Sequence, residues 1–205
     1  SALVSTSASA VEGLSANAAV TSNYLWRGIT QSNDDAAVSG GIDYESNSGV
    51  YAGTWVSSLG GASEFDLYAG YAGDAGSFTY DIGYIFYGYP SSVNSTGDAD
   101  FSEVYLSVGI DAFTLGVSVL ADAEWDADFA DDIYYSADYT LEVEGLEVSF
   151  HAGLYDTDTS FAEGNVYDGY DLGMSVSKNG FTFGVNDHEN TNSTVYVSYS
   201  VDFDL

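Results

Sequence analysis

The sequence lacks cysteine and long hydrophobic runs, and each absence narrows the class of protein. Without cysteine there are no disulfides, which suits a cell-envelope protein but also a cytosolic one. No stretch has 18 consecutive apolar residues, so no transmembrane helix is expected. Residues 1–13 lack the basic start and apolar centre of a signal peptide, so we expect that an exported chain has already lost its signal.

Positive charge is also scarce. Lys and Arg total 2 against 32 Asp and Glu, which gives a formal net charge of −30. Binding to nucleic acid is excluded, because phosphate contacts need clustered Lys and Arg. Two explanations of the acidity remain open at this point. It can be an adaptation of the surface to high salt, or the carboxylates can share one location in the fold.

What the chain has in quantity favours β-structure. It contains 18 Tyr, 11 Phe and 3 Trp, together with 23 Gly and a single Pro, a composition that suits many strands joined by tight turns. Its 205 residues allow one domain or at most two.

Apolar and polar residues alternate with a period of two, most clearly over residues 194–205. Successive side chains of a strand point to opposite faces, so each such segment has one apolar face and one polar face. The pattern predicts twelve strands, most of them long enough to cross a bilayer as tilted strands. They are expected at 14–28, 36–46, 50–58, 64–72, 78–89, 102–111, 113–124, 132–143, 146–155, 167–177, 181–187 and 194–205.

Short and long connections alternate along the chain, as in outer-membrane barrels with tight periplasmic turns and longer outer loops. We therefore predict an all-β fold, a transmembrane antiparallel up-and-down β-barrel of 12 strands over residues 14–205. Residues 1–13 are expected to be a periplasmic tail or a plug, and the even strand number places both termini on the periplasmic side.

Aromatic residues on the apolar face are expected to form two girdles at the membrane interfaces. The girdle on the long-loop side would contain Tyr24, Trp26, Tyr84, Phe86, Trp125, Tyr135 and Tyr170. The girdle on the short-turn side would contain Tyr44, Tyr71, Phe78, Phe113, Phe181 and Phe203.

The carboxylates of the strands fall on the polar face, which becomes the lumen of such a barrel. A lumen rich in carboxylates either conducts cations or forms a closed polar core. Twelve strands enclose an intermediate space, which inward-facing tyrosines would narrow further. The predicted pore-lining residues are Arg27, Asp43, Glu64, Asp66, Asp81, Glu103, Asp122, Glu124, Asp138, Glu142, Glu147, Asp171 and Asp202.

The segment Ser22-Asn23-Tyr24-Leu25-Trp26-Arg27-Gly28-Ile29-Thr30-Gln31-Ser32 resembles the opening motif of the TorF family of porins, in which a Tyr precedes an Arg-Gly pair. Similar pieces follow in the same order at 49–53, 65–71, 80–84 and 89–90, so the resemblance is specific over residues 14–90. It implies an outer-membrane location in a Gram-negative bacterium and a porin role.

Arg27 within that motif is expected to bind lumen carboxylates through charge-assisted hydrogen bonds, with Glu64, Asp66 and Glu103 as candidate partners. Two roles are open for it. It can be a residue of the constriction, or it can tie wall strands together, and the second is favoured.

An enzyme is not expected. Ser149 and His151 share one face but point inward, whereas outer-membrane phospholipases place their Ser and His on the lipid side. A lipid-facing stripe poor in large residues could form a protomer contact or ordinary wall, which leaves a homo-oligomer open. It contains Ala16, Ala18, Ala36, Val38 and Gly40. Acidic outer loops could bind Ca²⁺ or form a solvated rim. The loop residues concerned are Asn33, Asp34, Asp35, Asp98, Asp100, Asp126, Asp128, Asp131, Asp132, Asp156 and Asp158.

The sequence therefore predicts a narrow, passive porin that prefers cations or small polar solutes. The expected partners are outer-membrane lipid, lipopolysaccharide and the solute, with no nucleic acid, no resident metal and no cofactor. The alternative is a closed structural or surface-interaction barrel with acidic, Ca²⁺-binding loops.

Overall fold

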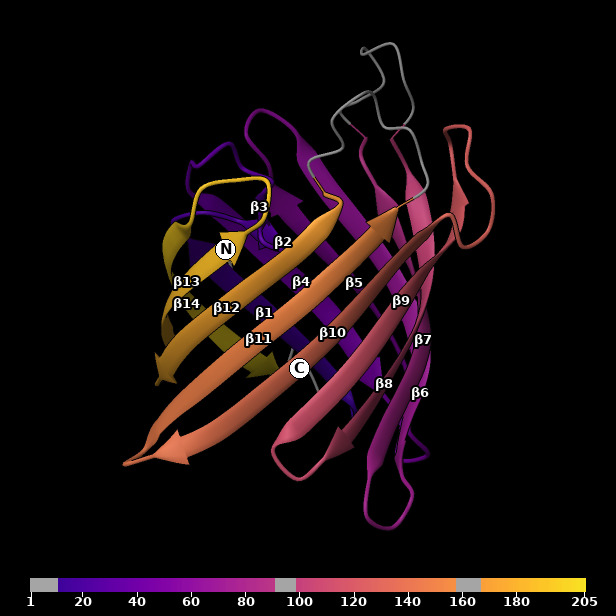
Figure 1. The fold of residues 1–205 in the computed structure, drawn as a ribbon. Coiled ribbons are helices and arrows are strands. Elements are labelled where there is room, and N and C mark those ends of the chain that lie inside the picture. The colour runs from indigo at the N-terminus through magenta and orange to yellow at the C-terminus, as the bar shows by residue number, and fades with distance from the viewer. Residues whose placement is uncertain (1–10, 91–98, 158–166) are drawn as a thin grey trace, which may run out of the picture.

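The computed structural model describes residues 11–90, 99–157 and 167–205. Twelve strands form one closed antiparallel barrel in which β1 pairs with both β4 and β14, and β2 and β3 form a separate hairpin (Figure 1). In chain order the strands are β1 (Leu14–Thr21), β2 (Leu25–Trp26), β3 (Ile29–Thr30), β4 (Ala37–Glu45), β5 (Val50–Ser58), β6 (Ser63–Asp74), β7 (Thr79–Gly88), β8 (Phe101–Ile110), β9 (Phe113–Ala123), β10 (Asp132–Val143), β11 (Leu146–Thr157), β12 (Gly169–Lys178), β13 (Phe181–His188) and β14 (Thr194–Asp204). Among the described residues, no helix is long and apolar enough to cross a membrane.

The predicted twelve-stranded barrel is confirmed, and the ends of β4 to β14 lie within about two residues of the predicted ends. The first predicted strand, 14–28, is wrong beyond Thr21. There the chain leaves the wall, and residues 22–36 fold into the barrel around β2 and β3. We call residues 22–36 the inner hairpin.

Backbone conformation explains why the chain turns there. Arg27 and Gly28 link β2 to β3 as a two-residue turn, and both have positive φ, 47° and 80°. Positive φ at both central residues is the signature of the type I′ turn that two-residue hairpins favour. The Arg-Gly pair of the sequence motif is therefore a hairpin turn rather than part of a wall strand.

Two-residue turns with positive φ also join neighbouring wall strands at one end of the barrel. Glu144 and Gly145 join β10 to β11, and Asn179 and Gly180 join β12 to β13, all with positive φ. Figure 1 shows these short turns at its lower end and the longer connections at its upper end. Val11 donates a hydrogen bond to the carbonyl of Leu205 at the short-turn end, 2.7 Å, so the described ends of the chain meet there.

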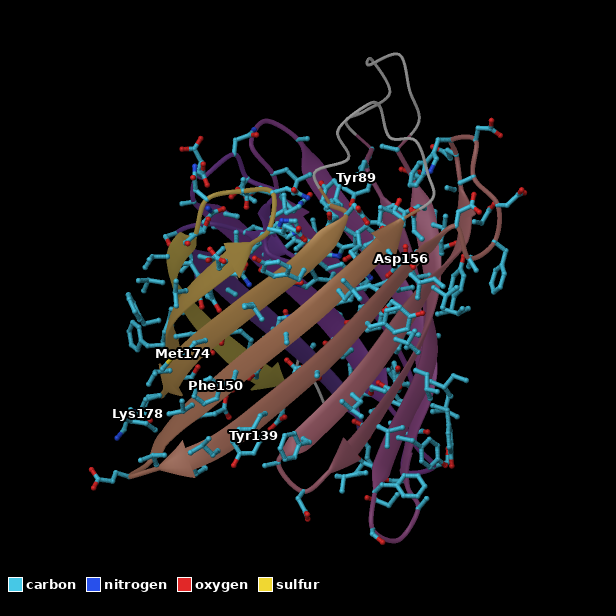
Figure 2. The ribbon with its side chains drawn as sticks, viewed as in Figure 1. Tyr89, Tyr139, Phe150, Asp156, Met174 and Lys178 are labelled. Atoms are coloured by element: carbon cyan, nitrogen blue, oxygen red, sulfur yellow. The ribbon has the colours of Figure 1, made fainter. Side chains whose placement is uncertain are left out.

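Burial runs opposite to that of a water-soluble domain. Among the described residues, buried polar and charged side chains outnumber buried hydrophobic ones. Large apolar side chains cover the outside of the wall, and Val38, Phe181 and Val195 are each about 60% exposed. Figure 2 shows Tyr139, Phe150 and Met174 on the outer face of neighbouring strands β10, β11 and β12. An apolar outside and a polar inside are the arrangement of a barrel whose solvent is lipid.

The aromatic girdles are partly as predicted. Tyr84, Tyr135 and Tyr170 are more than 40% exposed on the long-loop side, and all six residues predicted for the short-turn side are exposed. Three members of the predicted outer girdle point inward instead. Tyr24 and Trp26 belong to the inner hairpin, and the ring of Trp125 packs against Phe101 with 5.6 Å between ring centroids.

Candidate functional site

The inner hairpin is held in shape by its own polar side chains. Asn23 is only 6% exposed, donates to Asp34 at 2.8 Å and accepts from the hydroxyl of Thr30 at 2.6 Å. The hydroxyl of Ser32, also buried, donates to the carbonyl of Asp35 at 2.6 Å. These short-range bonds satisfy polar groups that the hairpin brings inside the barrel.

Tyr24 fastens the hairpin to the wall on one side. Its hydroxyl donates to Glu64 of β6 at 2.6 Å, and its ring meets Trp55 of β5 edge-on with 5.5 Å between centroids. Burial and the negative charge of Glu64 hold the pKa of the Tyr24 phenol above its usual value. The phenol therefore stays protonated and remains a hydrogen-bond donor at every physiological pH.

Arg27 fastens the tip of the hairpin to the opposite wall. Its guanidinium donates to Glu103 of β8 at 2.8 Å, and both side chains are more than 90% buried. The Arg27 Cζ also lies over the rings of Trp26, Tyr134 and Tyr155, at 4.2, 4.3 and 4.9 Å from their centroids. Of the three predicted partners, the structure selects Glu103. A cation enclosed by rings and one carboxylate is a strong anchor, because each contact gains strength away from water.

Gly28, at the turn, touches the wall at β12 and β13. A Cβ atom added there would lie 2.6 Å from Asn186 Oδ1 and 2.8 Å from Asp171 Cβ, which is closer than such contacts occur. The hairpin thus starts at β1, meets β5 and β6 through Tyr24, and ends against β8 and β10–β13. It crosses the lumen on the long-loop side.

His151 organises the wall beside the hairpin. Its Nδ1 lies 2.7 Å from Asp138 and its Nε2 lies 3.1 Å from Asp171 and 2.8 Å from the hydroxyl of Tyr134. These contacts join β10, β11 and β12. The hydroxyl of Ser149 bonds that of Thr140 at 2.9 Å and not the imidazole, so the two residues are not arranged as a nucleophile and its base.

A cavity of about 580 Å³ lies between the hairpin and the wall formed by β10–β14, β1 and β4. Asp138, His151 and Asp171 line it on one side, and Arg27 and Gly28 reach it from the hairpin. Serine and asparagine side chains supply much of the remaining lining, namely Ser39, Ser149, Ser175, Ser198, Asn23 and Asn186. Its lining can hydrate an ion or a small polar solute.

Tyrosines bind the carboxylates in the short-turn half of the barrel. The hydroxyl of Tyr51 donates to Asp81 at 2.6 Å and also contacts the hydroxyl of Tyr105. Tyr68 donates to Asp43, which also accepts from Asn17 at 3.0 Å. No piece of chain crosses the described lumen here comparable to the inner hairpin, so the hydroxyl–carboxylate pairs line the wall.

The predicted pore-lining residues divide into four groups. Those around the inner hairpin are buried: Arg27, Glu64, Asp66, Glu103 and Asp171. Those beside tyrosine or histidine are half-buried: Asp43, Asp81 and Asp138. Those near the short-turn mouth are exposed: Glu142, Glu147 and Asp202. The last two, Asp122 and Glu124, lie at the long-loop end and are exposed.

The structure contradicts the prediction for Asp122. A β-bulge shifts the register, so that Glu103 lies opposite Leu120 but Ser102 lies opposite Asp122. Directly opposed residues share a face. The outward-facing Leu67 opposes Phe86, which opposes Ser102, so Asp122 points outward. The extra residue of a bulge reverses the alternation beyond it. Glu124 lies past the end of β9, where its Oε2 accepts a hydrogen bond from the backbone N–H of Asp100 at 3.4 Å.

Sequence reasoning missed the aromatic surroundings of Arg27 and the role of Gly28. A signal was present, since Arg-Gly lies between Leu25-Trp26 and Ile29-Thr30 with the spacing of a two-residue hairpin. The predicted loop carboxylates Asp98 and Asp158, and residues 1–10 of the predicted tail, lie outside the described residues. Within the described ranges, no group of three or more His, Cys, Asp or Glu is placed to hold a metal ion.

Solved structures share this architecture at low sequence identity. The "KdgM porin" matches with a TM-score of 0.59 and 10% identity, covering 93% of this chain and 99% of that one. "KdgM porin in complex with disordered oligogalacturonate" matches with a TM-score of 0.57 and 9% identity over 94% and 98% of the two chains. At this identity the likeness establishes the barrel fold.

Among curated proteins, none matches this chain. The TorF name does not occur in these comparisons, so the resemblance over residues 14–90 stays a prediction. The sequence profile of Gcw_chp, described as "Bacterial protein of unknown function", matches residues 5–202. The chain therefore belongs to the bacterial family Gcw_chp.

Proposed function

We propose that this protein is a porin of the bacterial outer membrane that passes cations or small polar solutes by a narrow path, with the inner hairpin as its constriction. The apolar outer face would contact outer-membrane lipid, and the long loops would face lipopolysaccharide and the exterior. The likeness to porins in fold supports this proposal without extending to the solute.

The balance of charge inside the barrel carries the proposal. Arg27 is the one Lys or Arg in the described lumen, since Lys178 ends β12 at the short-turn end, and the charge of Arg27 is already paired with Glu103. Of the remaining inward carboxylates predicted to line the pore, Asp138 and Asp171 share His151, which carries one positive charge at most, and the others have no basic partner among the described residues. Unbalanced negative charge in a low-dielectric wall attracts cations and repels anions.

Asp66 adds a specific attraction next to the hairpin. It is 5% exposed, and its Oδ1 has no hydrogen-bond partner among the described residues. A buried carboxylate oxygen without a partner is costly, and its charge would add to the negative potential beside the hairpin. Asp138, which lies 2.7 Å from His151 Nδ1, brings a second carboxylate to the separate cavity on the β10–β14 side of the hairpin.

The test is the reversal potential of the purified barrel in a planar bilayer under a potassium chloride gradient. We expect a value close to the potassium equilibrium potential, and a clear shift toward zero for Asp66→Asn and Asp138→Asn. Asp122→Asn is the matched control, because the same charge is removed from the outer face and the potential should stay unchanged. A wild-type reversal potential at zero or on the chloride side would reject cation preference.

A second function is favoured by one observation, namely that the inner hairpin touches walls on both sides of the lumen. A hairpin seated this firmly could close the barrel and leave a structural or surface-interaction protein. Absence of conductance above background from the folded wild-type barrel would favour this alternative.

A further inference from the structure

A second cavity, of about 180 Å³, opens on the long-loop side above the inner hairpin. Its lining includes Trp26, Phe101, Trp125, Tyr155, Tyr167 and Asp132, and we call this set the vestibule. Figure 2 shows Tyr89, another lining residue, close to the outer loops. Trp26 and Tyr155 hold Arg27 on one side, but Phe101, Trp125 and Tyr167 take part in no step of the proposed conduction, so their arrangement needs its own explanation.

The vestibule rings are arranged as a box. Phe101, Tyr155 and Tyr167 stand at 70°, 81° and 75° to the plane of Trp26, with centroids 5.6 to 6.0 Å away. Trp125 continues the wall beside Phe101 at 5.6 Å. Aromatic rings that stand nearly perpendicular to Trp26 enclose one small space with several π faces. Aromatic cages of this kind recognise alkylated ammonium ions.

Two of these rings already hold a cation on their inner side. The Arg27 guanidinium lies 4.2 Å from the centroid of Trp26 and 4.9 Å from that of Tyr155. Its charge is neutralised by Glu103 at 2.8 Å, which lowers the repulsion that a second cation would meet on the outer side. The electrostatic character of the rings therefore suits cations on both sides of Trp26.

The polar groups also favour a cation over a sugar. Asp132 contributes a carboxylate that is only 4% exposed, which brings a formal negative charge to the edge of the box. Gln31, the neutral amide of the lining, already donates to the carbonyl of Ile29 at 3.2 Å and contacts the hydroxyl of Tyr167 at 3.4 Å. A neutral sugar would gain nothing from the charge of the buried carboxylate, whereas an alkylated ammonium ion gains from both the rings and the negative charge.

We infer that the vestibule binds a small quaternary or methylated ammonium ion at the outer mouth of the barrel. The overall charge of −30 would concentrate such cations near the mouth. The site does not depend on an open lumen, because it lies on the outer side of the hairpin.

Calorimetry on the full chain, folded in detergent micelles at constant ionic strength, tests the inference. In separate experiments the protein is titrated with choline chloride and with 3,3-dimethylbutan-1-ol, which has the same shape without the charge. We expect saturable choline binding at least about tenfold tighter than that of the neutral compound, since only the cation gains electrostatic attraction from the faces of the rings. Equal binding of the two compounds, or no saturable choline binding, would overturn the inference.

Variants locate the site. Trp125→Leu, Tyr167→Leu and Asp132→Asn should each weaken choline binding about fivefold or more. Tyr84→Leu is the matched control, because its ring lies on the outer face of the same end and should leave the affinity unchanged. Choline affinity that survives all three vestibule changes would contradict the assignment, as would saturable binding of glucose in place of choline.

The result is separate from the proposed porin role. Binding in micelles with no conductance in bilayers would support the vestibule and reject the porin. Conductance without choline binding would do the reverse.

Discussion

The two halves of the barrel handle the same acidic lumen differently. On the long-loop side the inner hairpin fills the space, and Glu64, Asp66, Glu103 and Asp171 are at most 5% exposed. On the short-turn side the carboxylates line the wall beside tyrosine hydroxyls or face the mouth in the open. The comparison teaches that lumen carboxylates can belong either to a constriction or to a hydrated wall. A crossing piece of chain decides between the two.

Removing the crossing segment should have the largest effect. The backbone N–H of Gln31 donates to the carbonyl of Tyr24 at 2.7 Å, so these residues already face each other as a hairpin pair. Replacing residues 25–30 by Asn-Gly would close the shorter hairpin with a type I′ turn. We expect unit conductance in planar bilayers to rise at least about twofold, as the path widens toward that of an open barrel. Unchanged conductance, in a barrel with wild-type circular dichroism, would show that the hairpin does not limit the path.

Breaking the anchor of the hairpin should give the next largest effect. Arg27→Ala leaves Glu103 buried without its partner, and such losses cost about 3 to 5 kcal/mol of unfolding free energy. Urea titration of the barrel in lipid vesicles measures it. Lys178→Ala is the control, because this exposed cation lies at the end of β12, beside a short turn, and should leave stability nearly unchanged. Equal stability of the Arg27→Ala variant and the wild type would contradict the anchor.

Adding a methyl group at the turn of the inner hairpin should have an intermediate effect on stability and conductance. Gly28→Ala adds strain at φ +80° and a contact 2.6 Å from Asn186, and overpacking of this kind costs about 1 to 3 kcal/mol. The matched control is Gly61→Ala, at φ +102° with nothing within 4 Å of the added atom, which carries the strain alone. We expect only Gly28→Ala to change unit conductance, and equal effects of both changes would mean that the tip does not seat against the wall.

The smallest effect is expected in the short-turn half. Tyr51→Phe removes the donor to Asp81, and a hydrogen bond of this type contributes about 1 kcal/mol. Conductance should stay close to that of the wild type, because this half is not the narrow one. A conductance change larger than that of Gly28→Ala would reverse the comparison between the halves.

The barrel could be predicted from the sequence because its signals are local. Alternation over residues such as 194–205 fixes faces, and Glu144-Gly145 or Asn179-Gly180 fixes turns. The inner hairpin could not be predicted by alternation, since Tyr24 and Trp26 continue the period of β1 while leaving the wall. Its destination depends on long-range contacts, chiefly Arg27 with Glu103 and Tyr24 with Glu64.

The sequence did not predict the outward direction of the Asp122 side chain, for a related reason. One extra residue in β9 changes its face, and a bulge depends on pairing with β8 rather than on the sequence of β9 alone. The aromatic box likewise combines rings from the hairpin, β8, β11 and two connections, which no single segment reveals.

The central claim is that the hairpin half sets selectivity. The most direct test is the reversal potential of the wild type and of the variant with residues 25–30 replaced by Asn-Gly, under the same potassium chloride gradient. We predict that the potential moves clearly toward zero in the variant, because a wider path lets salt screen the carboxylates over a Debye length of about 8 to 10 Å. A reversal potential that stays near the potassium limit would contradict the account and place selectivity in the short-turn half.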